Sequence, residues 1–210
     1  MSRISSDFVP QLLAGMVVNF QIAAIALLVG LAVGGLLTLA KLAGGVRGAV
    51  ATTLIGLMRA APTFVVMFFL LNIIPSDATL FGVHVAPSGI MTVALSLVPY
   101  AAAYVADNGG EALRQLRDGS PLGALLFLPN VTRAFFVLVM SSSAGAAIGV
   151  PEGIAVILRE AELMPTLGDK MVLFAIGILC FGVTLQVGFA LMRLLQRHLS
   201  RRAVGDDPAV

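Results

Sequence analysis

The sequence has few charged residues, and this scarcity decides the class of protein. Charged residues make up 11% of the 210 residues and hydrophobic residues 59%, whereas soluble domains average about 25% charged and about 45–50% apolar. The mean hydropathy is +1.01. A chain this short cannot hide such an excess of apolar residues from water. The composition therefore excludes an ordinary water-soluble domain and indicates an integral membrane protein.

Charge is also absent from long continuous stretches. No Asp, Glu, Lys or Arg occurs in residues 8–40, 78–106 or 171–192. About 20 mostly apolar residues are needed for a helix to cross the hydrocarbon core, and inside lipid every backbone group must be paired within the segment. The runs lack the polar–apolar alternation of a membrane β-barrel strand. The prediction is an all-α fold that crosses the bilayer several times.

The residues that carry most enzyme chemistry are missing as well. Cys180 is the single cysteine, so no disulfide framework exists. His84 and His198 fall on opposite sides of the membrane in the topology below, which excludes a zinc site of the usual spacing. No phosphate-binding loop of the G-x-x-x-x-G-K-[ST] type occurs, and serines 141–143 have no intramembrane base to activate them. We expect no catalysis, metal or cofactor, and any ATP energy must come from a partner.

The polar segments divide one transmembrane domain, residues 1–210, into five expected spans. The spans cover about 15–40, 49–75, 87–106, 131–150 and 171–192. Segment 107–130 joins the third span to the fourth, and segment 151–170 joins the fourth to the fifth.

Basic residues orient this topology, because cytoplasmic loops carry an excess of Lys and Arg. With the N-terminus outside and the C-terminus in the cytoplasm, segment 107–130 is cytoplasmic and segment 151–170 external. The outside then holds Arg3, Arg159 and Lys170, and the inside holds Lys41, Arg47, Arg114, Arg117, Arg193, Arg197, Arg201 and Arg202. The net charge of +2 thus reflects the positive-inside rule and not a nucleic-acid partner.

Small residues indicate where helices approach one another. Gly30 and Gly34 are four residues apart, and Ser141, Gly145 and Gly149 are expected to form a row along one helix face. Small residues at this spacing let helix backbones come close in lipid. The row fits packing within the chain or a seam between two chains.

In order, the segments resemble the permease subunits of ATP-binding-cassette (ABC) importers for polar amino acids. The first helix of that family resembles residues 12–42, LLAGMVVNFQIAAIALLVGLAVGGLLTLAKL. The strongest match is LIGLMRAAPTFVVMFFLLNIIP at 54–75, where Arg59, two small residues and Pro62 precede a Phe-rich run. The stretch ALSLVPYAAAYVADNGGEALRQL at 94–116 resembles the family's Tyr-x-Ala-Glu helix, with Asp107 in place of Glu, and ILREAEL at 157–163 resembles the segment before its last span.

This resemblance implies a set of partners and a place in the cell. The implied partners are a cytoplasmic ATP-binding subunit, a second permease that is identical or paralogous, and an extracytoplasmic solute-binding protein. The implied location is the lipid bilayer of the bacterial inner membrane. The implied function is import of a small polar solute, with an amino acid as the expected substrate class. Glu152, Glu160, Glu162 and Asp169 are expected to form an acidic external region that either meets the binding protein or is simply solvated.

The expected substrate pathway contains Arg59, Pro62, Thr63, Tyr104 and Asp107. A charge within a span costs at least about 2.5 kcal/mol, so Arg59 should face protein, water or an opposite charge. Alternatively, span two starts later and Arg59 reaches the cytoplasmic interface by extending its side chain. Asp107 ends a span and fits a solvated helix end equally well, and Tyr104 fits packing as well as binding.

One motif departs from the family. Its cytoplasmic coupling loop, E-A-A then three residues and G, aligns near PLGALLFLPN, and the segment expected to contact the ATPase comprises Pro121, Leu122, Gly123, Ala124, Pro129 and Asn130. Ala124 fits the pattern, but the Glu position falls on or near Leu122. Either a second permease carries the intact loop, or this chain couples through a largely apolar contact, or the likeness reflects only general membrane-helix composition.

The departure keeps two other functions open. The first is a non-transporting scaffold or degenerate permease half in a multi-subunit membrane complex. The second is a small ion-coupled carrier, which would need inverted repeats or acidic residues within the spans; the sequence has neither.

Overall fold

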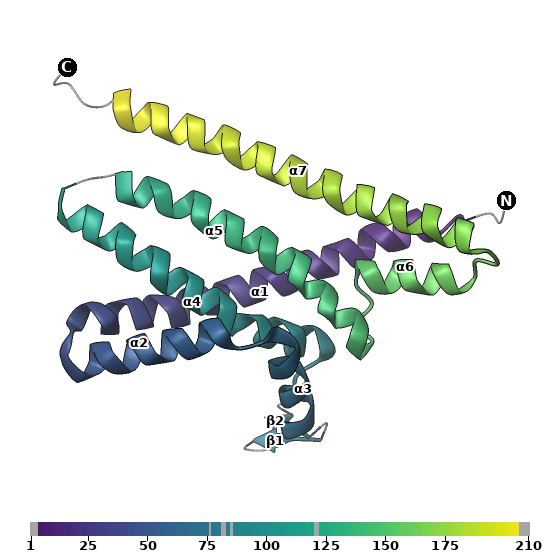
Figure 1. Ribbon diagram of the computed structural model, residues 1–210, viewed down its shortest axis with the longest axis horizontal. Coiled ribbons are helices and arrows are strands. Elements are labelled where there is room, and N and C mark those ends of the chain that lie inside the picture. Colours follow the sequence, from purple (N-terminus) through teal and green to yellow (C-terminus); the bar gives the residue numbers. More distant parts are fainter. Residues whose placement is uncertain (1–3, 76, 81–82, 85, 120–121, 206–210) are drawn as a thin grey trace.

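The computed structural model describes residues 4–75, 77–80, 83–84, 86–119 and 122–205, and helices account for almost all of them (Figure 1). In chain order the elements are α1 (Phe8–Ala43), α2 (Gly45–Ala60), α3 (Thr63–Ile73), the strands β1 (Thr79–Leu80) and β2 (Val83–His84), α4 (Gly89–Arg117), α5 (Leu122–Ser141), the 3-10 helix η1 (Ser142–Ile148), α6 (Gly153–Glu162) and α7 (Leu167–Gly205). The strands form one small antiparallel hairpin, with Thr79 opposite His84.

Four described stretches are long and apolar enough to cross a membrane: Phe8–Ala43, Gly89–Arg117, Phe127–Ile148 and Leu167–Leu194. Helices α2 and α3 satisfy the same test only as a pair, which adds a fifth, broken span. The expected all-α membrane fold with about five spans is therefore confirmed. The side on which each terminus lies, and the exact span boundaries, stay predictions.

Helices α1 and α4 form the centre of the molecule, and two glycines bring them together. A Cβ atom built on Gly30 would lie 2.4 Å from the Cβ of Ala101, and one on Gly34 would lie 2.5 Å from the carbonyl oxygen of Ala102. Only residues without a side chain fit there, as expected for closely packed membrane helices. Thr38, one turn further along α1, donates to the carbonyl of Gly34 at 2.8 Å.

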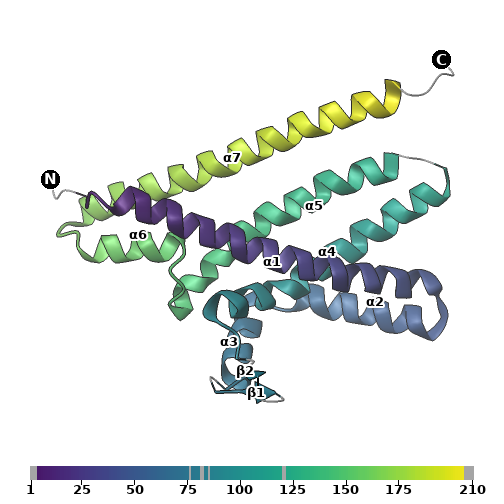
Figure 2. The ribbon, with the colours of Figure 1, turned by 180° about the vertical axis from the view of Figure 1, so that it is seen from behind.

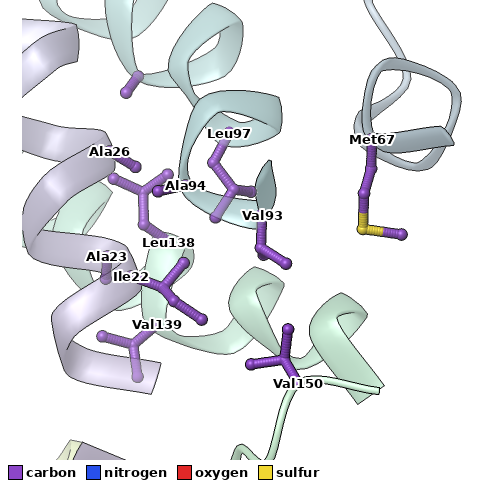
Figure 3. Packing of buried hydrophobic residues seen from close by; sticks show 11 residues of the cluster. Ile22, Ala23, Ala26, Met67, Val93, Ala94, Leu97, Leu138, Val139 and Val150 are labelled. Atoms are coloured by element: carbon purple, nitrogen blue, oxygen red, sulfur yellow. The ribbon is translucent and has the colours of Figure 1, made fainter. Parts of the chain in front are cut away.

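The largest apolar cluster surrounds this pair (Figure 3). Helix α1 contributes Ile22, Ala23 and Ala26 to the cluster, α4 contributes Val93, Ala94 and Leu97, and α5 contributes Leu138 and Val139. Met67 of α3 and Val150 approach the same cluster from the other side.

The second predicted span is broken where the sequence places a proline. Helices α2 and α3 meet at 97°, and the two residues between them, Ala61 and Pro62, are both extended. Proline cannot donate the backbone hydrogen bond that would continue α2, and it disfavours the helical conformation of the residue before it. The break therefore follows directly from Pro62.

The segment after α5 differs from the expected continuous helix. Residues Ser142–Ile148 tighten into a 3-10 helix, and Gly149 ends it with a left-handed φ of 79°. A 3-10 helix has three residues per turn, so Ser141, Gly145 and Gly149 do not share one α-helical face. Of the two glycines, Gly145 makes a close approach, to Val150 and Val93, and Gly149 does not.

Helix α7 lies along the outer edge of the molecule, as both ribbon views show (Figures 1 and 2). Within its apolar stretch Leu167–Leu194, only 11% of the 18-residue apolar segment is buried inside the chain. Its first turns join α6 and the start of α1 in a second apolar cluster that includes Phe8, Leu12, Ile157 and Leu173. Further along, Phe136 of α5 packs against Phe189, with ring centroids 4.4 Å apart.

Candidate functional site

An ion pair joins the broken span to the central helix. The Nη2 atom of Arg59, in the last turn of α2, contacts the Oδ2 atom of Asp107 on α4. The Arg59 side chain is 62% exposed and that of Asp107 38%. Arg59 therefore has an opposite charge as its partner, and the two residues that were predicted separately for the pathway lie together.

Two tyrosines precede Asp107 on α4. The rings of Tyr100 and Tyr104 have centroids 6.1 Å apart, and residues three or four apart on a helix are surface neighbours. Both tyrosines are half-buried. Tyr100 was not predicted, although its spacing of four residues from Tyr104 is a signal that the sequence offers.

The other two predicted pathway residues lie at the bend. Pro62 is exposed and precedes the first turn of α3, and Thr63 begins that helix half-buried. Arg59 stands just before the bend, so these residues and the ion pair occupy the same break in the span. The arrangement offers a guanidinium and a carboxylate beside the break between α2 and α3, a hydroxyl at the start of α3, and two phenol groups on the same helix as the carboxylate.

The sequence missed a buried polar cluster made by Asn19, Ser142 and Glu152. The Asn19 side-chain NH₂ donates to Ser142 Oγ and to Glu152 Oε2, both at 2.8 Å. Its oxygen accepts from the Gly153 amide at 3.0 Å. These bonds connect α1, η1 and the start of α6, and every polar atom of the three side chains has a partner within the described part of the chain.

Glu152 also caps α6. Its carboxylate accepts from the amides of Ile154 at 3.0 Å and Ala155 at 2.9 Å, which are free at a helix N-terminus. Burial raises the pKa of the Glu152 carboxyl, and hydrogen bonds from the Ile154 amide, the Asn19 side chain and the Ala155 amide act in the opposite direction. Glu152 is fully buried, so its carboxylate has a structural role and is not accessible to a solute.

Only part of the predicted acidic external region therefore lies on the surface of the protein. Glu152 is fully buried, Glu160 is 8% exposed and Asp169 is half-buried, while Glu162 is exposed. The Glu160 carboxylate accepts from the backbone amide of Ser5 at 2.7 Å and from its hydroxyl at 3.1 Å. Glu160 therefore holds the N-terminal segment against α6, and half of the expected acidic patch is committed to contacts within the chain.

The predicted coupling segment is described only in part. Pro121 lies outside the described residues, as do the side chains of Leu122, Gly123 and Ala124. Pro129 and Asn130 are half-buried within α5. The described part, from Leu122 onward, is helical.

No family model matches the sequence, and no curated protein matches it. A comparison of structures does find a match, to a structure described as the crystal structure of an amino acid ABC transporter with histidines. The TM-score is 0.67 at 17% sequence identity, and the match covers 91% of this chain and 95% of that one. This chain has the fold of an ABC transporter chain.

The ABC transporter fold agrees with the resemblance that the residues suggested. The structural match covers nearly the whole of both chains. At 17% identity the likeness concerns the backbone, so the roles of individual residues rest on the contacts described above. Within this fold, the Arg59–Asp107 pair, the two tyrosines and the bend at Pro62 form the strongest candidate site.

Proposed function

We propose that this chain is the membrane-spanning permease subunit of an ABC-type importer that moves a small polar solute, most readily an amino acid. A separate cytoplasmic ATPase powers it, a second permease completes the pathway, and an extracytoplasmic binding protein delivers the solute. The fold likeness over 91% of the chain is the observation that carries this proposal. The absence of a phosphate-binding loop from the sequence supports a separate source of energy.

The proposed orientation places the N-terminus outside and the C-terminus in the cytoplasm of a bacterial cell. The distribution of basic residues supports it. In this orientation the α4–α5 connection faces the cytoplasm, where an ATPase would contact it, and α6 lies toward the outside.

The charges of the candidate site suit an amino acid. A zwitterion carries a carboxylate that can accept two parallel hydrogen bonds from Arg59 and an ammonium that can bind Asp107. Both side chains are substantially exposed, and exposed ion pairs contribute only about 0–1 kcal/mol. The pair can therefore open at small cost and exchange its internal partners for those of the solute.

Substitution of Arg59 tests this part of the proposal. We expect Arg59→Ala to reduce uptake of polar amino acids about tenfold or more, because loss of a hydrogen bond to a charged group costs roughly 1.5–3 kcal/mol. The amount of protein in the membrane should change little. Arg47→Ala is the matched control, since Arg47 is an exposed arginine at the other end of α2. Normal uptake by the Arg59→Ala variant would remove Arg59 from the pathway.

The second candidate function is a non-transporting membrane scaffold. Leu122 where the family's coupling loop has Glu favours it, because a permease without an ATPase contact could not be driven. Purification of the tagged chain in mild detergent separates the two functions. Recovery of an ATP-binding subunit supports the permease, and a stable complex with unrelated membrane enzymes supports the scaffold.

A further inference from the structure

An apolar groove lies between α1, α4 and α5, with a volume of about 430 Å³. Its walls are formed by α1 between Leu31 and Leu39 and by α4 between Val105 and Leu116, and Phe127 contributes from α5. At 1.5 Å per residue, the α4 wall is about 16 Å long. The hollow therefore follows the helices for about three turns.

Two glycines in the walls leave this space open. A Cβ atom on Gly35 would meet nothing within 4 Å. One on Gly109 would lie 3.5 Å from the Thr38 hydroxyl oxygen and 3.8 Å from the Phe127 ring. Both glycines line the groove, so a larger side chain at Gly35 would project into it.

The chemistry of the walls favours a hydrocarbon occupant. Among the described residues that line the groove, Thr38 alone has a polar side chain, and its hydroxyl already donates to the Gly34 carbonyl at 2.8 Å. A polar solute would lose its hydrogen bonds to water without replacement, and apolar cavities hold water poorly. Both wall helices are long and apolar enough to cross a membrane, so lipid chains are the hydrocarbon at hand.

Basic residues follow the groove walls at one end. Lys41 comes three residues after Thr38 on α1, and Arg117 comes four residues after Leu113 on α4. Residues at these spacings share a helix face. The two cations therefore lie one turn beyond the apolar walls, on the same side of their helices as wall residues.

This end of the groove has a net positive charge. Segments 41–47 and 111–118 together hold four basic residues and two acidic ones. The ion pair described above is the only one among the described residues, so no carboxylate of that part of the chain neutralises Lys41 or Arg117 in an ion pair. An apolar groove followed by unpaired cations is complementary to a ligand with a hydrocarbon chain and an anionic head.

We propose that the groove binds one anionic phospholipid, with an acyl chain between α1 and α4 and the phosphate beside Lys41 and Arg117. Basic sites between membrane helices bind the head groups of anionic lipids. In the proposed orientation this end faces the cytoplasm, where the leaflet carries anionic lipids. The proposal goes beyond the proposed function, because lipid binding requires neither an ATPase nor transport.

Native mass spectrometry of the full chain tests the charge requirement. The chain is released from nanodiscs of phosphatidylcholine that contain phosphatidylglycerol with the same acyl chains, and the bound lipids are counted. We expect one phosphatidylglycerol per chain to bind more tightly than phosphatidylcholine. Lys41→Gln and Arg117→Gln should each raise its dissociation constant about fivefold, the equivalent of about 1 kcal/mol for each basic residue near an anionic surface.

Arg159→Gln is the matched control for charge. Arg159 is an exposed arginine on α6, at the other end of the molecule (Figure 1), so its loss removes the same charge and should leave the dissociation constant unchanged. Equal affinities for the two lipids, or equal effects of Arg117→Gln and Arg159→Gln, would overturn the proposal.

Filling the groove tests the acyl chain. Gly35→Leu should remove the tightly bound lipid, because the new side chain occupies its place. Gly56→Leu is the control, since a Cβ atom on Gly56 of α2 also meets nothing within 4 Å but Gly56 does not line the groove. A Gly35→Leu variant that keeps the lipid would overturn the proposal. Displacement of the lipid by glycerol phosphate, which has no acyl chain, would do the same, and so would a photo-cross-linker at Leu39 that labels a polypeptide instead of lipid in native membranes.

Discussion

Replacing Gly34 by alanine should destabilise the central helix pair by an amount that the structure allows us to work out. The new Cβ atom would lie 2.5 Å from the Ala102 carbonyl oxygen and 2.8 Å from the Val105 Cβ. The first of these atoms belongs to the backbone of a buried helix and cannot rotate away. Restoring an ordinary contact of 3.4 Å from 2.5 Å requires the Cβ atom and the carbonyl oxygen to move apart by 0.9 Å, so α1 and α4 must separate locally.

The cost of that separation exceeds the usual benefit of removing a glycine. A gap of about 0.5–1 Å forfeits about a quarter to a half of each van der Waals contact along the seam, and overpacking typically costs about 1–3 kcal/mol. Alanine in place of glycine in a helix contributes about 0.5–1 kcal/mol of stability. The net expectation for Gly34→Ala is a loss of up to about 2.5 kcal/mol, after subtraction of the second range from the first.

The neighbouring glycine is the matched control. Gly35 has nothing within 4 Å of its hypothetical Cβ atom, so Gly35→Ala should retain only the favourable helix term. Thermal unfolding in detergent measures both variants, and about 2–4 °C per kcal/mol is typical for a chain of this size. We expect the midpoint of Gly34→Ala to fall by up to about 10 °C and that of Gly35→Ala to stay equal or rise. A Gly34→Ala variant as stable as Gly35→Ala would refute the close α1–α4 contact.

Two further predictions concern the buried polar cluster. Asn19→Ala should lower the thermal midpoint, because it leaves the buried Gly153 amide unpaired, at about 1–3 kcal/mol, and removes one of the two hydrogen bonds to Glu152 Oε2. Asn72→Ala is its control, since exposed Asn72 bonds only the Phe68 carbonyl in its own helix; equal losses in the two variants would contradict the cluster. The raised pKa of Glu152 gives a pH dependence, because a carboxyl that holds its proton more tightly when folded stabilises the fold below its ordinary pKa of about 4.3. That contribution is lost as pH rises through the higher folded pKa, so Glu152→Gln should flatten the decline in melting midpoint above pH 4; an unchanged slope would show that Glu152 does not titrate with folding.

The sequence was sufficient to predict the membrane-spanning helices because their causes are local. Long uncharged runs predict membrane helices, and Pro62 predicts the break between α2 and α3, since proline removes a hydrogen bond wherever it falls. The 3-10 helix η1 was missed because small apolar residues such as those in Ser142–Ile148 fit either helix type, and packing against neighbouring elements decides between them.

The candidate site was less predictable because it depends on how separate elements meet. Arg59 and Asp107 are 48 residues apart. Arg59 was singled out as a charge within a span and Asp107 as the end of another, without any sign that the two were partners. Glu152 was expected to lie on the surface, either solvated or in contact with a binding protein, because charged residues between spans are usually solvated. The buried carboxylate accepts a hydrogen bond from Asn19, which is 133 residues away. Asn19 is a single polar residue in an apolar run, and the sequence gives no sign of this contact.

Solute uptake by a reconstituted complex is the most direct test of the central claim. The chain would be incorporated into liposomes with the ATP-binding subunit that co-purifies with it, and radiolabelled polar amino acids supplied with the matching binding protein. We predict accumulation that requires ATP and that falls with Arg59→Ala but not with Arg47→Ala. Vesicles that contain the intact complex and hydrolyse ATP, yet accumulate none of these solutes above ATP-free controls, would contradict the claim.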